Sequence, residues 1–169
     1  MSKTNFGHLH VHTEYSILDG MSKIKELVSS VKEMGQDFIA ITDHGSTSGL
    51  YEAQKIGKEY GIKIIFGCEF YYERENDHKN GHLVVFAKNN KGIENLFKLQ
   101  EYAYVHNFYY KPRINFDILK FYSEGLIVTS SCLGSAFNQM IIAGDLVGAT
   151  AWAKKFKEVF GDDFYIEIQ

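Results

Sequence analysis

Several residue types and patterns that mark common protein classes are scarce or missing from this chain of 169 residues. One proline and 15 scattered glycines argue against a disordered chain or a long linker. Two cysteines and the lack of an export signal lead us to expect a reduced, cytoplasmic protein. No apolar run approaches the ~20 residues that a membrane span needs. We therefore expect neither a structural disulfide nor a membrane partner.

Strong positive charge and the glycine motifs of nucleotide-binding folds are also missing. The formal net charge is −3 and the pI is about 6.2, which excludes the electrostatic footprint of tight, non-specific nucleic-acid binding. A DNA partner would have to be held by a local site or by another part of a larger protein. Neither G-x-G-x-x-G nor the P-loop pattern occurs. The composition, with 45% apolar and 23% charged residues, is that of one ordinary globular domain.

Apolar periodicity predicts an alternation of helices and strands. Helices are expected on either side of Gly144–Asp145 and at residues 24–34, 49–60 and 92–105, with Phe97 and Tyr104 among the core residues of the last of these. Strands are expected at residues 6–12, 37–42, 62–67, 82–88, 125–130 and 163–169, and a solvated loop at 73–81. The alternation predicts an α/β fold of parallel strands joined by right-handed crossovers. Because nucleotide-binding motifs are missing, a complete or shortened barrel is favoured, with its chemistry at the strand ends.

Residue types that bind zinc and similar ions stand where the predicted strands end. Four strand ends carry them: His10 and His12, then His44, Glu69 and Cys132. Because side chains alternate along a strand, His10 and His12 can converge on one ion. His8 shares their parity but lies about 6.6 Å further back, so we expect it to line the site or to pack beneath it. His82 stands at the beginning of its predicted strand, so the strand-end rule places it at the opposite end from the other candidates.

Simpler explanations exist for each of these residues. A single histidine at a strand end is most often a core or surface residue, and an isolated cysteine such as Cys68 is most often a small buried hydrophobe. Asp19 precedes Gly20 and fits a turn, and Asp43 fits a cap of the helix that follows. The metal interpretation is favoured because ligand-type residues coincide at several independent strand ends.

The chain resembles a known family in six motifs that occur in the family's order: HLHVHTEYSILDG, AITDHGSTSGLYE, GCEFY, YYKPRINFDIL, VTSSCLGS and GDDFYIEIQ. These are similar to motifs of the N-terminal PHP domain (polymerase and histidinol phosphatase) of the bacterial DNA polymerase III alpha subunit. The resemblance covers essentially all of residues 1–169 as one PHP domain, with the polymerase domains absent. It implies a distorted (β/α)7 barrel, shortened at its C-terminus to about five or six parallel strands with flanking helices.

In that family, nine side chains hold up to three metal ions at the carboxyl ends of the strands. Seven of them match residues of this chain: His10, His12, Asp19, His44, Glu69, His82 and Cys132. The resemblance implies that Glu69 bridges two ions, and that Glu69 and His12 stand at the reacting centre. It also implies that His82 reaches the site after all, because the loop before it folds back. The cysteine thiolate favours zinc, with manganese as the alternative.

The two remaining family ligands form an Asp-x-His motif further downstream, and this chain ends before it. We therefore expect one or two bound ions here. We also expect weak hydrolysis, or none, by this chain alone, because hydrolysis needs at least two ions placed together.

The resemblance implies a role in DNA replication, as part of a DNA-directed DNA polymerase, a nucleotidyltransferase. The implied PHP activity is a phosphoesterase that removes the primer 3′ end as a 3′–5′ exonuclease, with ions about 3.5–4 Å apart. The implied partners are primer DNA, the remainder of the polymerase and other replisome subunits. Lys111 and Arg113 are candidates for a phosphate contact, with an exposed pair beside a proline turn as the alternative. Two other functions stay open: a structural module that braces the polymerase and binds a partner exonuclease subunit, and a free-standing small-molecule phosphatase.

Overall fold

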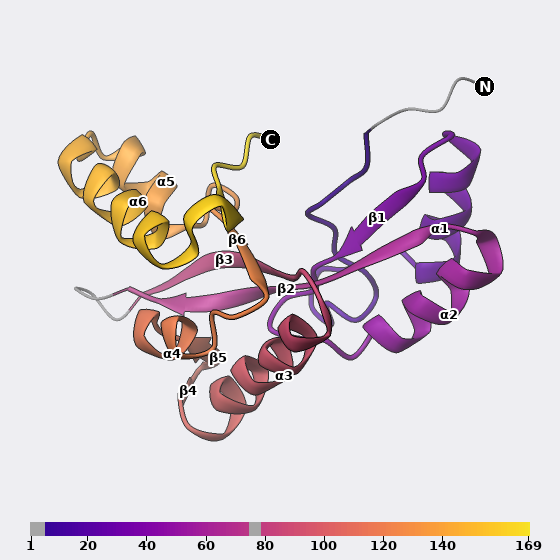
Figure 1. The fold of residues 1–169 in the computed structure, drawn as a ribbon, viewed down its shortest axis with the longest axis horizontal. Helices are drawn as coiled ribbons and strands as arrows, with labels where there is room; N and C mark the ends of the chain where they lie inside the picture. Colours follow the sequence, from indigo (N-terminus) through magenta and orange to yellow (C-terminus); the bar gives the residue numbers. More distant parts are fainter. Residues whose placement is uncertain (1–5, 75–78) are drawn as a thin grey trace. The chain divides into compact units, whose positions relative to one another are not determined.

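The structure is a computed structural model that describes residues 6–74 and 79–169. Contacts in space between residues divide the chain into two compact units, Met1–Cys68 and Glu69–Gln169. The boundary falls inside the long strand β2 (Lys63–Glu73), so each unit contains part of this strand. Helices flank the strands of both units, which confirms the expected α/β class (Figure 1). Residues 75–78 of the predicted solvated loop lie outside the described residues.

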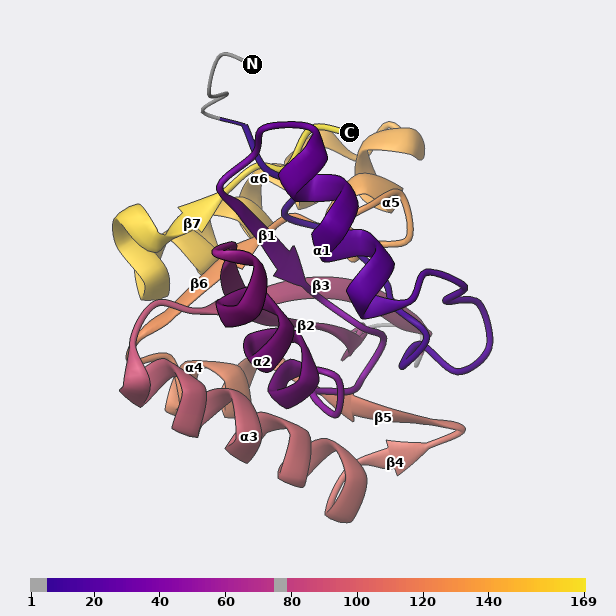
Figure 2. The ribbon, with the colours of Figure 1, turned by 90° about the vertical axis from the view of Figure 1, so that its right-hand side faces the viewer.

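The first unit contains a parallel strand pair and two helices. Its elements are α1 (Ile24–Glu33), β1 (Phe38–Ile41), α2 (Leu50–Tyr60) and the start of β2. β1 pairs in parallel with β2, with Ile39 opposite Ile64. The two helices pack against one another and lie over the same face of β1 (Figure 2). Each helix is followed by a glycine in the left-handed region, Gly35 with φ 72° and Gly61 with φ 73°, as is typical of helix C-termini.

The histidine-rich segment at residues 6–12 lies beside β1 but does not form the predicted regular strand. The carbonyl groups of His8 and Val11 accept hydrogen bonds from the N–H groups of Ala40 and Thr42, both at 2.9 Å. The acceptors are three residues apart and the donors two, so the segment carries one extra residue. The chain bends at Leu9–His10 to accommodate it, and this irregularity interrupts the ladder as a β-bulge does.

The second unit is a mixed sheet with helices on both faces. After the end of β2 come β3 (Asn80–Ala87), α3 (Asn90–Val105), β4 (Phe108–Tyr109), β5 (Lys111–Ile114), α4 (Phe116–Phe121), β6 (Leu126–Thr129), α5 (Ala136–Ile142), α6 (Leu146–Phe160), a 3-10 turn at Gly161–Asp163 and β7 (Phe164–Tyr165). The strand order among the described residues is β4-β5-β2-β3-β6-β7, an open path. α3 packs against β3 and β5, and α6 packs against β6 and β7. Figure 1 shows α3 on one side of these strands and α5 and α6 on the other.

The prediction that all strands are parallel holds for only some of the pairs in the second unit. β2 and β5 are parallel, as are β6 and β7, but β3 runs antiparallel to β6 and β4 antiparallel to β5. β2 also extends beyond the predicted end at residue 67, because Phe70 and Tyr72 continue its buried alternation. The predicted strand at 163–169 is confined to Phe164–Tyr165.

Two predicted core residues of α3 lie on its outer face. Phe97 is 48% exposed and Tyr104 is 49% exposed, whereas Leu96 and Leu99 are fully buried. The buried residues follow the i, i+3 and i+4 spacing that defines the face toward the sheet, and Phe97 and Tyr104 fall outside this stripe.

Phe156 is the centre of the core between α6 and the sheet of the second unit. The residue is fully buried and its ring stacks on Trp152 at 3.8 Å between centroids. We predict that Phe156→Ala lowers the free energy of unfolding by about 3–5 kcal/mol, because it leaves a cavity among aromatic rings. Urea unfolding followed by circular dichroism measures this. The matched control, Phe121→Ala on a ring that is 76% exposed, is expected to change stability by less than about 0.5 kcal/mol, and equal losses would contradict the assignment.

Candidate metal centre

Glu69 is a carboxylate buried in the middle of a strand. It lies in β2 and only 1% of the residue is exposed. The prediction that it stands at a strand end is therefore wrong, because β2 continues to Glu73. Its Oε1 accepts hydrogen bonds from the Ser131 hydroxyl at 3.2 Å and from the Cys132 thiol at 3.4 Å. A buried carboxylate is costly unless it is paired, so these contacts are what allow β2 to carry it.

His82 reaches Glu69 because β3 is antiparallel to β6. Val85 pairs with Val128, so the beginning of β3 lies beside the segment that follows the end of β6. The backbone N–H of His82 also donates to the Gly134 carbonyl at 3.2 Å. The simple strand-end rule, which placed His82 at the opposite end, assumed parallel strands and is wrong for this reason. The His82 Nδ1 atom lies 3.1 Å from Glu69 Oε1.

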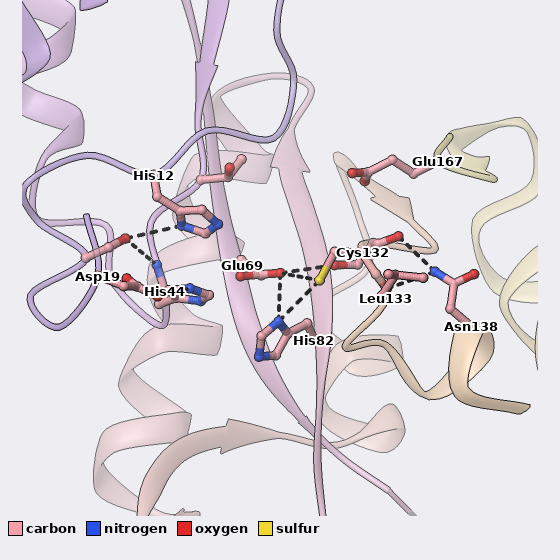
Figure 3. Close-up of polar contacts among 12 residues, drawn as sticks. His12, Asp19, His44, Glu69, His82, Cys132, Leu133, Asn138 and Glu167 are labelled. Carbon is pink, nitrogen blue, oxygen red and sulfur yellow. Dashed lines mark hydrogen bonds and ion pairs between the residues drawn. The ribbon is translucent and has the colours of Figure 1, made fainter. Parts of the chain in front are cut away.

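Cys132 is placed by a tight turn after β6. Ser131 has a φ of 58°, a left-handed conformation that is uncommon for a residue with a side chain. The Asn138 amide, on α5, donates to the carbonyls of Ser131 and Cys132 at 3.1 and 2.8 Å. These bonds hold the turn and direct the Cys132 sulfur toward Glu69 and His82 (Figure 3). Ser131 and Asn138 were not singled out from the sequence, although Ser131 belongs to the quoted VTSSCLGS motif.

The three predicted ligands of the second unit, Glu69, His82 and Cys132, form a compact trio of oxygen, nitrogen and sulfur atoms. The Cys132 sulfur lies 3.4 Å from both Glu69 Oε1 and His82 Nδ1. Tetrahedral zinc with ligand bonds of about 2.0–2.3 Å requires ligand atoms about 3.3–3.6 Å apart. Both sulfur distances fall in this range, whereas the 3.1 Å between Glu69 Oε1 and His82 Nδ1 is slightly shorter. The trio therefore fits one zinc-sized ion once the carboxylate and the imidazole move slightly apart, with room in its coordination for a fourth ligand.

The same contacts favour a proton on His82. Hydrogen bonds with the Cys132 sulfur and then with the Glu69 carboxylate raise the pKa of His82 from 6.5 to about 10, against the opposing effect of burial. A metal ion can bind the histidine nitrogen only after this proton leaves. Metal affinity at this trio is therefore coupled to pH.

The other four predicted ligands, His10, His12, Asp19 and His44, gather in the first unit. His44 Nε2 lies 3.0 Å from Asp19 Oδ2. The rings of His12 and His44 stack at 4.1 Å with an interplanar angle of 19°, and Figure 3 shows their side chains close to Asp19. Ligand nitrogens of His10 and His12 lie within 4.8 Å of one another. His8 is exposed, with its ring edge-on to Phe6, so it does not pack beneath the cluster.

Asp43 has a different role from the helix cap that the sequence indicated. The helix after it, α2, begins with Gly49 at its N-cap, and Asp43 is 1% exposed. Its carboxylate accepts hydrogen bonds from Thr13 and Ser16, which follow the histidine pair. The available sequence signal was the small hydroxyl residues directly after His12.

The two basic candidates occupy different surroundings. The Lys111 ammonium lies 5.1 Å from the centroid of the Tyr71 ring, and that ring meets His82 edge-on at 5.8 Å. Arg113 is 6% exposed, and its guanidinium lies 3.5 Å from the carboxylate of Glu73. The alternative of an exposed pair is wrong for Arg113. A phosphate contact by either residue stays a prediction.

Comparison with known proteins identifies the family of this chain. The sequence pattern of the PHP domain matches residues 8–169. The chain belongs to the PHP domain family. DNA polymerase III subunit alpha of Aquifex aeolicus (strain VF5) is 42% identical over 183 residues, which takes in 100% of this chain and 16% of that protein. The same subunit of Treponema pallidum (strain Nichols) is 41% identical over 179 residues, with 100% of this chain and 15% of that protein covered.

The fold also occurs in a solved structure. A two-domain protein from Bacteroides vulgatus ATCC 8482, which contains a predicted PHP-like metal-dependent phosphoesterase, matches with a TM-score of 0.55 and 13% identity over 89% of this chain and 41% of that one. This PHP domain is thus homologous to a part of bacterial polymerase III alpha subunits and spans 15–16% of their length. Within the described ranges, no helix has the length and apolar character needed to cross a bilayer.

The raised pKa of His82 predicts how stability depends on pH in chelator-treated protein. Because the pKa rises from 6.5 to about 10 on folding, the contribution is complete below about pH 6.5 and is lost as the pH rises toward 10. We expect the free energy of unfolding to fall over this range more steeply than in His82→Gln. The control His106→Gln, on an exposed histidine, should keep the wild-type slope. The same slope in His82→Gln and wild type would contradict the assignment.

Proposed function

We propose that this PHP domain is a metal-dependent phosphoesterase that hydrolyses the phosphodiester at the 3′ end of DNA, as part of a replicative polymerase. The observation that carries the proposal is the trio of Glu69, His82 and Cys132, whose ligand atoms lie 3.1–3.4 Å apart. The trio pairs a carboxylate and an imidazole with a thiolate, and this donor set suits zinc, with manganese as the alternative.

Each cluster has a role in the proposal. Glu69, His82 and Cys132 hold one ion in the second unit. His10, His12, Asp19 and His44 supply nitrogen and oxygen ligands in the first. When bound, the ions would polarise a phosphoryl oxygen and lower the pKa of a bound water. The assignment of Glu69 as a carboxylate shared by two ions stays a prediction.

The chain's own residues prepare this chemistry. Glu69 is held by Ser131, so its charge is aimed at the site rather than at solvent. The Asn138 amide fixes the turn that presents the Cys132 sulfur. Lys111 lies over Tyr71, next to His82, and is the proposed cation for a phosphate of the substrate. The formal net charge of −3 requires the rest of the polymerase to supply most of the DNA affinity.

The choice of DNA as substrate comes from the relatives, which are DNA polymerase subunits. A polymerase presents a primer 3′ end, and a phosphoesterase in the same protein would act on that end. The remaining parts of the polymerase and its replisome subunits are the proposed partners.

The test is hydrolysis of a 5′-labelled primer annealed to a template, with protein in excess so that a slow reaction is measured. We predict that zinc or manganese supports loss of 3′ nucleotides and that chelator abolishes it. Glu69→Gln is expected to reduce the rate by at least about 100-fold, because the variant removes a charged ligand of the ion.

The matched control is Glu124→Gln, the same chemical change at an exposed glutamate of the same unit. It should leave the rate unchanged. Hydrolysis that survives in Glu69→Gln, or that needs no metal, would contradict the proposal. A sugar phosphate cleaved while the primer stays intact would instead support a small-molecule phosphatase.

A further inference from the structure

We propose that Asp43 and Ser16 are positioning residues that fix the tautomer of His12, with the proton on Nδ1 and the lone pair on Nε2. The three residues form one hydrogen-bonded chain within the first unit. In this series of hydrogen bonds, the donor and acceptor of each bond follow from the bond before it.

This series of hydrogen bonds begins at the Asp43 carboxylate, which accepts from several donors. Asp43 Oδ1 accepts from the Thr13 N–H at 2.6 Å and from the Ser16 hydroxyl at 2.8 Å. Its Oδ2 accepts from the Thr13 hydroxyl at 2.9 Å. All three residues are buried, with at most 2% exposed. Both oxygens of Asp43 already accept from Thr13, so Asp43 is an acceptor here, and the single proton of the Ser16 hydroxyl points toward it.

The remaining contacts of Ser16 must then be acceptor contacts. The His44 backbone N–H donates to Ser16 Oγ at 3.1 Å. The other neighbour is His12 Nδ1, at 3.2 Å. Because a hydroxyl has one proton and two lone pairs, both lone pairs are used when His12 donates as well. If Ser16 instead donated to His12 Nδ1, its proton would no longer point toward Asp43. The Ser16 and Asp43 oxygens would then face each other as two acceptors at 2.8 Å.

A neutral imidazole carries one proton, so a proton on Nδ1 places the lone pair on Nε2. The His12 ring is also held in orientation by stacking on His44 at 4.1 Å. Ser16 therefore acts on two ligand-type histidines, through the ring of His12 and through the backbone of His44. Hydrogen bonds of this kind set which nitrogen of a histidine can bind a metal.

The inference rests on the proposed function in one respect: the tautomer matters for function because a metal ion would bind the lone pair on Nε2. The tautomer itself is a property of the metal-free protein. It is measured by nitrogen-15 NMR of the histidine rings at mildly alkaline pH, where protonated and unprotonated ring nitrogens resonate far apart. The chain has seven histidines, so the His12 signals are assigned by comparison with His12→Gln.

We expect the wild-type His12 ring to carry its proton on Nδ1. Ser16→Ala should lose this preference and shift the ring toward the Nε2–H form. The matched control is Thr13→Val, which removes another buried hydrogen bond to Asp43 but leaves Ser16 in place. It should keep the wild-type tautomer even if the protein is less stable. A merely structural role for Ser16 would give the same result in both variants.

Zinc titration followed on the His12 signals gives the second measurement. Ser16→Ala is expected to weaken zinc binding there by about 10–100-fold. A wild-type ring protonated on Nε2, or an unchanged tautomer or zinc affinity in Ser16→Ala, would overturn the inference. A wild-type Nδ1–H ring in a protein that binds no zinc at His12 would leave the tautomer assignment standing and overturn the part of the proposed function that gives the first unit a metal ion.

Discussion

A buried carboxylate within a strand is the constraint on which the second unit depends. Glu69 is 1% exposed, and a charge in such a place is tolerated only when donors or a cation surround it. The antiparallel pairing of β3 with β6 brings His82 to it, and the left-handed turn at Ser131 brings a hydroxyl and a thiol. Replacing these contacts by apolar groups would leave the carboxylate unpaired in the middle of the sheet. The contacts that make folding possible are therefore also the candidate metal ligands.

The first unit solves a similar problem by a different route. Asp43 is also buried, but its neighbours are a backbone N–H and two hydroxyl groups rather than a histidine and a thiol. Neutral donors satisfy the carboxylate without competing for a metal. One of them, the Ser16 hydroxyl, is also hydrogen-bonded to the ring of His12. The two buried carboxylates thus differ in their surroundings: Glu69 belongs to the trio of candidate ligands, whereas Asp43 is linked through Ser16 to the candidate ligand His12.

Local sequence patterns predicted the elements well where burial follows one period. The helices at 24–34, 49–60 and 92–105 and the strand at 37–42 were found by apolar spacing and glycine caps, and the structure confirms them. The predictions failed where a tertiary contact overrides the period. The extra residue near His10 prevents a regular strand, and β5 allows β2 to continue beyond Glu69. Phe97 and Tyr104 are apolar enough for a core, but the direction of α3 leaves them exposed.

The sequence by itself determined the order of the motifs, the family and the candidate ligand types, because these depend only on which residues occur and how they are spaced. It also supplied the residues that each cluster contains. Only the tertiary structure decided how they meet. His82 joins Glu69 through an antiparallel pairing that apolar periodicity does not encode, since strand direction is set by contacts between distant segments. The same is true of Ser16, which bonds to Asp43 across 27 residues of sequence.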